Sequence, residues 1–94
     1  MTLDNMTWDE KWNFTSNPTT TADALRHLIK DGDWRIRENV ATHPKASNKI
    51  LITLFEYEKS SKDPCPDVIR GLYYRANLPA FAKRVIETLY GDWL

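Results

Sequence analysis

Residues 31–44 (DGDWRIRENVATHP) constrain the fold most, because they hold the end of one helix and the whole of the next. Gly32 is typical of a residue that ends a helix. Asp33 can accept the free backbone N–H groups of a new first turn, and apolar residues then recur on one side of that helix. Pro44 disfavours helical geometry in the residue before it. We therefore expect a helix over residues 33–42 that closely follows another.

The landmarks of this helix pair recur along the chain, first after 26 residues and then after a longer interval of about 33 residues. Asn17-Pro18 returns 26 residues later as His43-Pro44. Leu25-x-x-Leu28 returns at the same offset as Leu51-x-x-Leu54. Asn77-Leu-Pro79 forms a third, looser turn. Self-similarity at such a period is typical of stacked helical repeats.

The order of these motifs resembles the leucine-rich repeat variant family, a relative of the HEAT-like α-solenoids. Its repeats read roughly Asn-Pro-x-Thr-Pro, then Leu-x-x-Leu, then Asp-x-Asp-x-x-Val-Arg-x-x-Val-Ala. Residues 17–44 follow this order, with Asp31-Gly-Asp33 and Ile36-Arg37-x-x-Val40-Ala41 as the last part, and the match is poor beyond about residue 55. The resemblance implies stacked helix pairs and a binding or scaffolding role. One family member carries a Cys-rich iron–sulfur segment, which a chain with Cys65 as its only cysteine cannot form.

We predict an all-α fold, a short right-handed α-solenoid of about two to three HEAT-like or leucine-rich-repeat-variant repeats. The single domain of residues 1–94 divides into an N-terminal capping segment (1–16), repeat 1 (17–44), repeat 2 (45–76) and a partial repeat or C-terminal cap (77–94). The expected helices cover residues 21–30, 33–42 and 47–58, with one beginning at Asp63-Pro64 or Cys65-Pro66 and a last one at Pro79.

Four structural details also follow from the sequence. The helix over residues 47–58 is the most apolar stretch and should be central to the core. Gly71 lies in the middle of a helix, which indicates close approach of a neighbouring helix. The polar residues 58–63 (EKSSKD) predict a mobile connection. The last helix should bury one face, made by Ala82, Val85, Ile86 and Leu89, and should end at Gly91.

Composition excludes several classes of function. The chain has 13 basic and 13 acidic residues, so no global field attracts nucleic acid or membranes. A lone cysteine rules out an internal disulfide and a Cys-based zinc site. His27 and His43 have no metal-ligand spacing, and His43 is expected to cap a turn. No catalytic motif, membrane span or signal peptide is recognisable, so we expect a cytoplasmic, cofactor-free protein without metal or catalytic residues.

The sequence therefore favours a non-catalytic protein–protein interaction module of the adaptor or inhibitor type. The capping box Thr7-x-x-Glu10 predicts a first helix that carries two tryptophans, either as a cap on the first repeat or as an aromatic hot spot for a partner. The candidate partner-binding residues are aromatic or charged and lie on this helix and on the second helix of each pair: Trp8, Trp12, Trp34, Arg35, Glu38, Arg70, Tyr74 and Arg75.

The alternative is weak nucleic-acid binding through a row of arginines on the concave face, namely Arg35, Arg37, Arg70 and Arg75. We expect Arg37 to pair with Asp31 or Asp33. Ion pairs between the other arginines and nearby acids would favour a protein partner, whereas one continuous positive face would favour nucleic acid. A homodimer through the last helix, with Phe81, Val85 and Trp93, is a further possibility for the oligomeric state.

Overall fold

The computed structural model describes residues 6–94, which form six α-helices, one short 3₁₀ helix and no strand. The all-α fold class is therefore confirmed for this part of the chain. The elements are α1 (Trp8–Ser16), α2 (Ala22–Arg26), α3 (Trp34–Thr42), α4 (Asn48–Ser60), α5 (Pro66–Tyr73), α6 (Ala80–Tyr90) and the 3₁₀ helix η2 (Gly91–Trp93).

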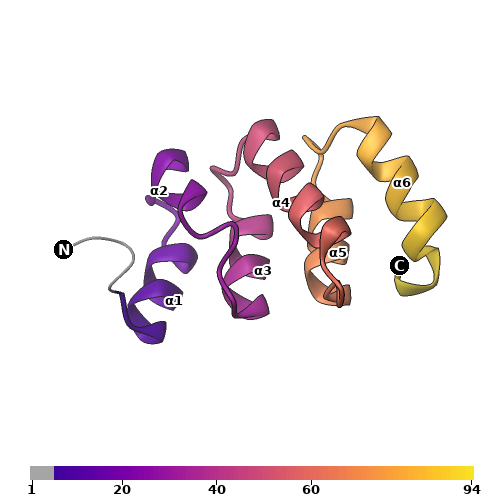
Figure 1. Cartoon of the computed structure of the whole chain (residues 1–94). Helices are drawn as coiled ribbons and strands as arrows, with labels where there is room; N and C mark the ends of the chain where they lie inside the picture. Colours follow the sequence, from indigo (N-terminus) through magenta and orange to yellow (C-terminus); the bar gives the residue numbers. More distant parts are fainter. Residues whose placement is uncertain (1–5) are drawn as a thin grey trace.

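The helices follow one another across the molecule in chain order (Figure 1). Helix α3 lies between α1 and α5 and contacts both, so these three helices form one layer. Helix α2 packs against α4, and α4 also contacts α3 and α5. Helix α6 packs against α5 and is followed by η2. Helices α1 to α5 thus contact a helix two positions away along the chain, whereas α6 packs on its neighbour α5.

Helix starts follow the local capping signals in the sequence. The Thr7 side chain accepts the Glu10 N–H at 3.2 Å, and the Glu10 carboxylate accepts the Thr7 N–H at 2.9 Å, so the predicted capping box is confirmed. The side chains of Asp33 and Ser47 also cap their helices, α3 and α4, by accepting the backbone N–H of Arg35 and of Ile50. Helix α5 begins at Pro66, which selects the second of the two predicted starts.

The helix predicted over residues 21–30 is shorter than expected. Helix α2 ends at Arg26, and residues 27–30 form hydrogen-bonded turns. The His27 N–H bonds the carbonyl of Ala24, and the Leu28 N–H bonds that of Leu25, each three residues back rather than four. This tighter winding keeps Leu28 buried, so the apolar spacing that predicted the helix is satisfied without a longer one.

The core confirms the predicted role of α4. Ile50, Leu51, Leu54 and Phe55 are all buried, and they join side chains from α2, α3, α5 and α6 in one cluster. Gly71 also behaves as predicted. A Cβ at that position would lie 3.3 Å from the Thr42 methyl carbon, so the missing side chain lets α5 approach α3 closely.

The mobile connection predicted from residue 58 is wrong at its beginning. Helix α4 continues to Ser60, and Glu58 is fully buried. Its Oε1 lies 2.6 Å from Nε of Arg37, and its Oε2 accepts the backbone N–H of Cys65 at 3.3 Å. Arg37 also donates from Nη1 to the carbonyl of Asp31 at 2.7 Å. A buried ion pair therefore ties α3, α4 and the start of α5 together.

The partners predicted for Arg37 are consequently wrong. The carboxylate of Asp31 instead accepts from Lys11 at 2.6 Å, and that of Asp33 accepts from Arg35 at 2.9 Å. Both acids lie nearer in sequence to Arg37 than Glu58 does. The buried position of Glu58 on α4 gives Arg37 a partner away from water, which the local spacing of charges does not reveal.

The side chain of His43 caps the turn that follows α3. His43 is buried, its Nδ1 accepts the Lys45 N–H at 3.0 Å, and its Nε2 is 2.7 Å from the carbonyl of Asn17. Since Nδ1 accepts, Nε2 carries the proton and donates it.

In α6, Ala82 and Ile86 are buried as predicted, but Leu89 remains 57% exposed because no further helix covers that end in residues 6–94.

Candidate partner-binding face

The predicted partner-binding residues all belong to the layer formed by α1, α3 and α5 or to the turn that follows α5. Two lie on α1, three on the first half of α3, one on α5 and two directly after it. The structure brings most of them into two groups. One is a tryptophan cluster between α1 and α3, and the other is a groove between α3 and α5.

The tryptophan cluster consists of Trp8, Trp12, Asp33 and Arg35. The two indole rings stack with centroids 5.3 Å apart, and the guanidinium carbon of Arg35 lies 4.8 Å from the centroid of the Trp8 ring. The Trp8 indole N–H donates to Oδ2 of Asp33 at 2.8 Å. Trp8 and Trp12 nevertheless keep 39% and 38% of their surface exposed. The cluster therefore presents aromatic surface in a fixed geometry while α1 packs on α3.

Charge in this cluster is locally compensated. Asp33 accepts from the Nε and Nη2 atoms of Arg35 at 3.1 and 2.9 Å and from the Arg35 backbone N–H at 2.9 Å. These hydrogen bonds from Arg35 hold the pKa of Asp33 well below its ordinary value, and the same contact raises the pKa of Arg35. Arg35 is thus a fixed, paired cation lying over an aromatic ring.

The α3–α5 groove has a volume of about 380 Å³ and contains four of the predicted residues. The Arg70 guanidinium pairs with Asp67 on the same helix and donates to the carbonyl of Trp93 at 3.3 Å. Tyr74 is 68% exposed and meets Tyr73 edge to face at 5.2 Å. The groove is lined by Glu38, Thr42, Asp67, Arg70, Gly71, Tyr74 and Arg75.

Glu38 is a partly buried acid in this groove. Burial raises its pKa above the ordinary value of 4.5, the nearby negative charge of Asp67 raises it further, and Arg70 partly opposes the shift. The groove therefore holds one carboxylate whose charge is poorly stabilised in the free protein. A cation or hydrogen-bond donor placed beside Glu38 would relieve that cost.

Replacing Glu38 with glutamine should raise the melting temperature at about pH 7 but not at about pH 3.5. Because the folded-state pKa is raised, the stability contributed by the protonated carboxyl is fully present below 4.5 and is lost as the pH rises through the folded pKa. Glutamine stays neutral throughout. Thermal melts of both proteins at the two pH values check this, and a variant that is less stable near neutral pH would contradict it.

Arg75 and Trp34 have different surroundings from the other candidates. Arg75 donates to the carbonyls of Ala41 and His43 at 2.9 and 2.5 Å, and burial lowers its pKa. It ties the end of α5 to the turn after α3, and its partly buried side chain also borders the groove. Trp34 lines a separate hollow with Tyr57 and Cys65, away from the groove.

Three groove-lining residues, Thr42, Asp67 and Gly71, were not among the candidates predicted from the sequence. A usable signal was present, because Thr42 stands four residues after Glu38 and therefore on the same face of α3. Asp67 and Arg70 stand three apart on α5, which also places them on one face. What the sequence lacked was the pairing of α3 with α5, which turns two helix faces into one groove.

Within residues 6–94, no group of three or more His, Cys, Asp or Glu side chains could hold a metal ion. None of the helices in that range is both long enough and apolar enough to cross a membrane. Comparison of the chain with family models, with curated proteins and with solved structures gives no match.

Proposed function

We propose that this chain is a non-catalytic protein-binding module, of adaptor or inhibitor type, that binds its partner with the α1–α3–α5 layer. The observation that carries the proposal is the presence of two exposed aromatic positions on this layer, the Trp8–Trp12 stack between α1 and α3 and Tyr74 at the α3–α5 groove. Tryptophan, tyrosine and arginine are the residue types that dominate binding energy in protein interfaces. The Trp8–Trp12 stack is held by its contacts with Asp33 and Arg35, so little conformational entropy is lost there when a partner binds.

We further propose that the helices form a short right-handed α-solenoid of the leucine-rich-repeat-variant type. The hydrogen bond from His43 to the carbonyl of Asn17 supports this, because it joins the equivalent X-Pro turns of two successive repeats. The side-by-side contacts of α1 with α3, α3 with α5 and α2 with α4 are those expected of stacked helix pairs. In this arrangement the binding layer consists of the second helices together with the N-terminal cap.

Nucleic-acid binding by the arginine row has less support. Arg35 is paired with Asp33, Arg70 with Asp67, and Arg37 with the buried Glu58. The guanidinium of Arg75 is directed to backbone carbonyls. Affinity for a phosphate backbone comes from cations that replace counterions, and a cation already paired with a carboxylate contributes little to it. The pairing of these arginines with carboxylates and backbone carbonyls therefore favours a protein partner over nucleic acid.

Substitution of the exposed aromatics should strongly reduce partner capture. We expect Trp12→Ala and Tyr74→Ala each to reduce the partner recovered from native lysate by at least about tenfold, the effect of losing about 1.4 kcal/mol of binding energy. Phe81→Ala on α6 is the matched control, since Phe81 is also an exposed aromatic, 54% accessible, but lies outside the proposed face. Equal capture by all three variants would contradict the assignment of this face.

A further inference from the structure

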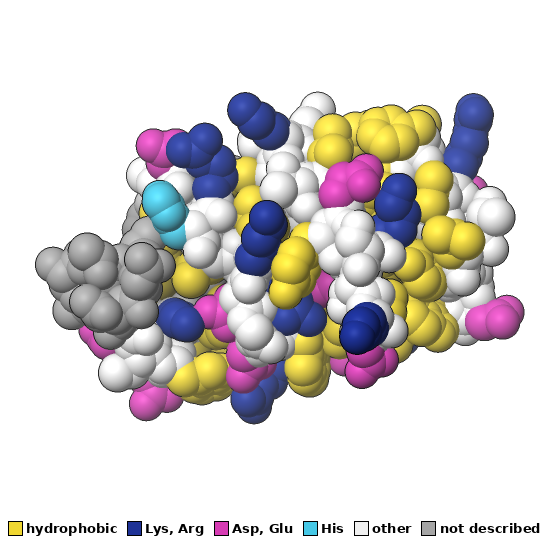
Figure 2. Space-filling view, viewed as in Figure 1, with side chains coloured by type: hydrophobic (Ala, Val, Ile, Leu, Met, Phe, Trp, Pro, Cys, Tyr) yellow, Lys and Arg dark blue, Asp and Glu magenta, His cyan; other side chains and the backbone are white. Residues whose placement is uncertain are grey.

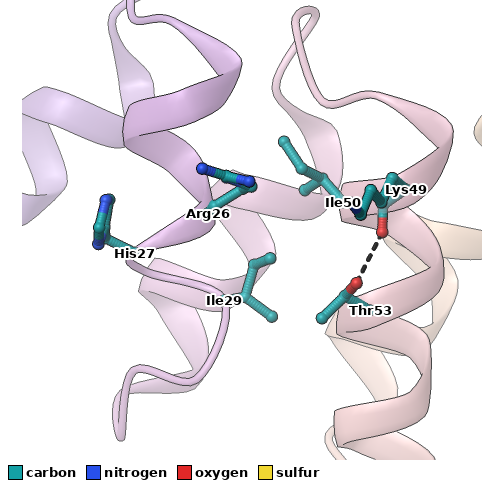
Figure 3. A pocket seen from close by; sticks show the side chains of 6 residues that line it. All are labelled: Arg26, His27, Ile29, Lys49, Ile50 and Thr53. Carbon is teal, nitrogen blue, oxygen red and sulfur yellow. Dashed lines mark hydrogen bonds between the residues drawn. The ribbon is translucent and has the colours of Figure 1, made fainter.

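A second surface lies on the other side of the helix pairs, between α2 and α4. Figure 3 shows its first hollow, of about 300 Å³, where Arg26 and Ile29 face Lys49, Ile50 and Thr53 across the gap between the two helices. The buried side chains of Ile29 and Ile50 form its floor. The exposed side chain of His27 also borders this hollow.

A second hollow of similar volume continues the first along α4. Thr53 borders both, and the second is bounded by Lys30 on one side and by Tyr57 on the other. We call the two together the α2–α4 furrow. It follows α4 from Lys49 to Ser60, a length of roughly 16 Å at the helical rise per residue. An extended peptide of about five residues would span it.

The charges of the furrow are predominantly positive. Lys and Arg side chains stand over α2 and α4 on the face that Figure 2 displays. Among the residues that the structure describes, Arg26 is paired with Asp23, but Lys30 and Lys49 have no carboxylate within 4.0 Å. Within residues 6–94, the one acid that borders the furrow is Glu56, which is itself paired with Lys59 at 3.5 Å. Two ammonium groups thus flank the furrow with their charge uncompensated.

We infer that the α2–α4 furrow binds an acidic peptide segment that carries apolar side chains between its carboxylates. Carboxylates would meet Lys30 and Lys49 at the rim, while an apolar side chain would rest on Ile29 and Ile50 and on the aliphatic stems of the basic residues. A peptide matches this combination better than a nucleic acid, whose phosphate backbone would gain little from so few cations. This surface is independent of the proposed α1–α3–α5 face.

The probe for this inference is a fluorescent hexapeptide, Asp-Glu-Leu-Asp-Glu-Leu, with Asn-Gln-Leu-Asn-Gln-Leu as its neutral counterpart. By fluorescence anisotropy we expect the acidic peptide to bind with a dissociation constant below about 1 mM and the neutral one at least about tenfold more weakly. The double variant Lys30→Glu/Lys49→Glu should weaken the acidic peptide by at least about tenfold. Both lysines are exposed, and thermal melts by circular dichroism verify that the variant is folded.

The matched control is Lys62→Glu/Arg84→Glu, which makes the same change in net charge at exposed positions outside the furrow. It should alter the dissociation constant by less than about twofold, as expected for distant surface charges at moderate salt. An equal loss of affinity for the acidic peptide in both double variants would show that only the net charge of the protein matters. That result would contradict binding at the furrow. Equal binding of the neutral peptide, absence of binding, or tighter binding of an oligothymidylate that displaces the acidic peptide would each overturn it too. These outcomes are independent of the capture experiment with Trp12→Ala and Tyr74→Ala, so failure of the furrow inference would not contradict the proposed α1–α3–α5 face.

Discussion

Replacing Glu58 with alanine should destabilise the protein by about 3–5 kcal/mol, because it leaves the charge of Arg37 buried without its partner. Glu58 is fully buried, and its carboxylate receives hydrogen bonds from Arg37 and from the Cys65 backbone. The variant loses both hydrogen bonds, which weakens the contact of α4 with α3 and with the start of α5. Urea denaturation monitored by circular dichroism measures the change in the free energy of unfolding.

The double variant Arg37→Met/Glu58→Leu separates the cost of an unpaired charge from the cost of lost packing. Apolar replacement of both partners removes the buried charge, and such replacements are often neutral or stabilising. We therefore expect the double variant to be more stable than Glu58→Ala, with much of the loss recovered. A loss below about 1 kcal/mol in Glu58→Ala would contradict the buried ion pair, since ordinary surface changes have effects of this size.

Leu54→Ala should destabilise the protein by about 2–5 kcal/mol through loss of apolar burial and creation of a cavity. Leu54 has no exposed surface and lies in the middle of α4, within the cluster that joins α2, α3, α5 and α6. Thr53→Ala is the control on the same helix, because Thr53 is exposed. The same urea titration applies, and a loss under about 0.5 kcal/mol in Leu54→Ala would contradict the core assignment.

Helix boundaries were predictable where they depend on neighbouring residues alone. Thr7, Asp33 and Ser47 each cap the helix that the sequence indicated, because a cap is a contact over two or three residues. Pro44 likewise ends α3 by its effect on His43. The buried positions of α4 followed from their helical spacing, and the need for glycine at position 71 followed from its cost inside a helix.

Features that depend on contacts between distant segments were not predictable in this way. Glu58 belongs to a polar run, and only the burial of α4 against α3 shows that it faces Arg37, 21 residues away. The hydrogen bonds of Arg75 were not predictable for a related reason. Its partners are backbone carbonyls, and every residue has one, so the sequence does not indicate which of them Arg75 contacts. The exposure of Leu89 depends on whether another element covers α6, and helical spacing carries no information on that point.

The candidate face was predictable in its residue types but not in its arrangement. Trp8, Trp12 and Tyr74 were recognisable as candidates by residue type, although the sequence left open whether the two tryptophans cap the first repeat or bind a partner. Their division into a tryptophan cluster and a groove follows from the packing of α1 and α5 on either side of α3. From the sequence, ion pairs between the candidate arginines and nearby acids were expected to favour a protein partner over nucleic acid. Arg35 and Arg70 both form such ion pairs.

The most direct test of the proposed function is affinity capture of binding partners from native lysate at about 150 mM salt, with and without nuclease treatment. A protein-binding module should retain the same protein partner after nuclease treatment, and the recovered amount should change little. Recovery that disappears with nuclease, and that declines as the salt concentration rises, would contradict a protein-binding role and would indicate binding to nucleic acid.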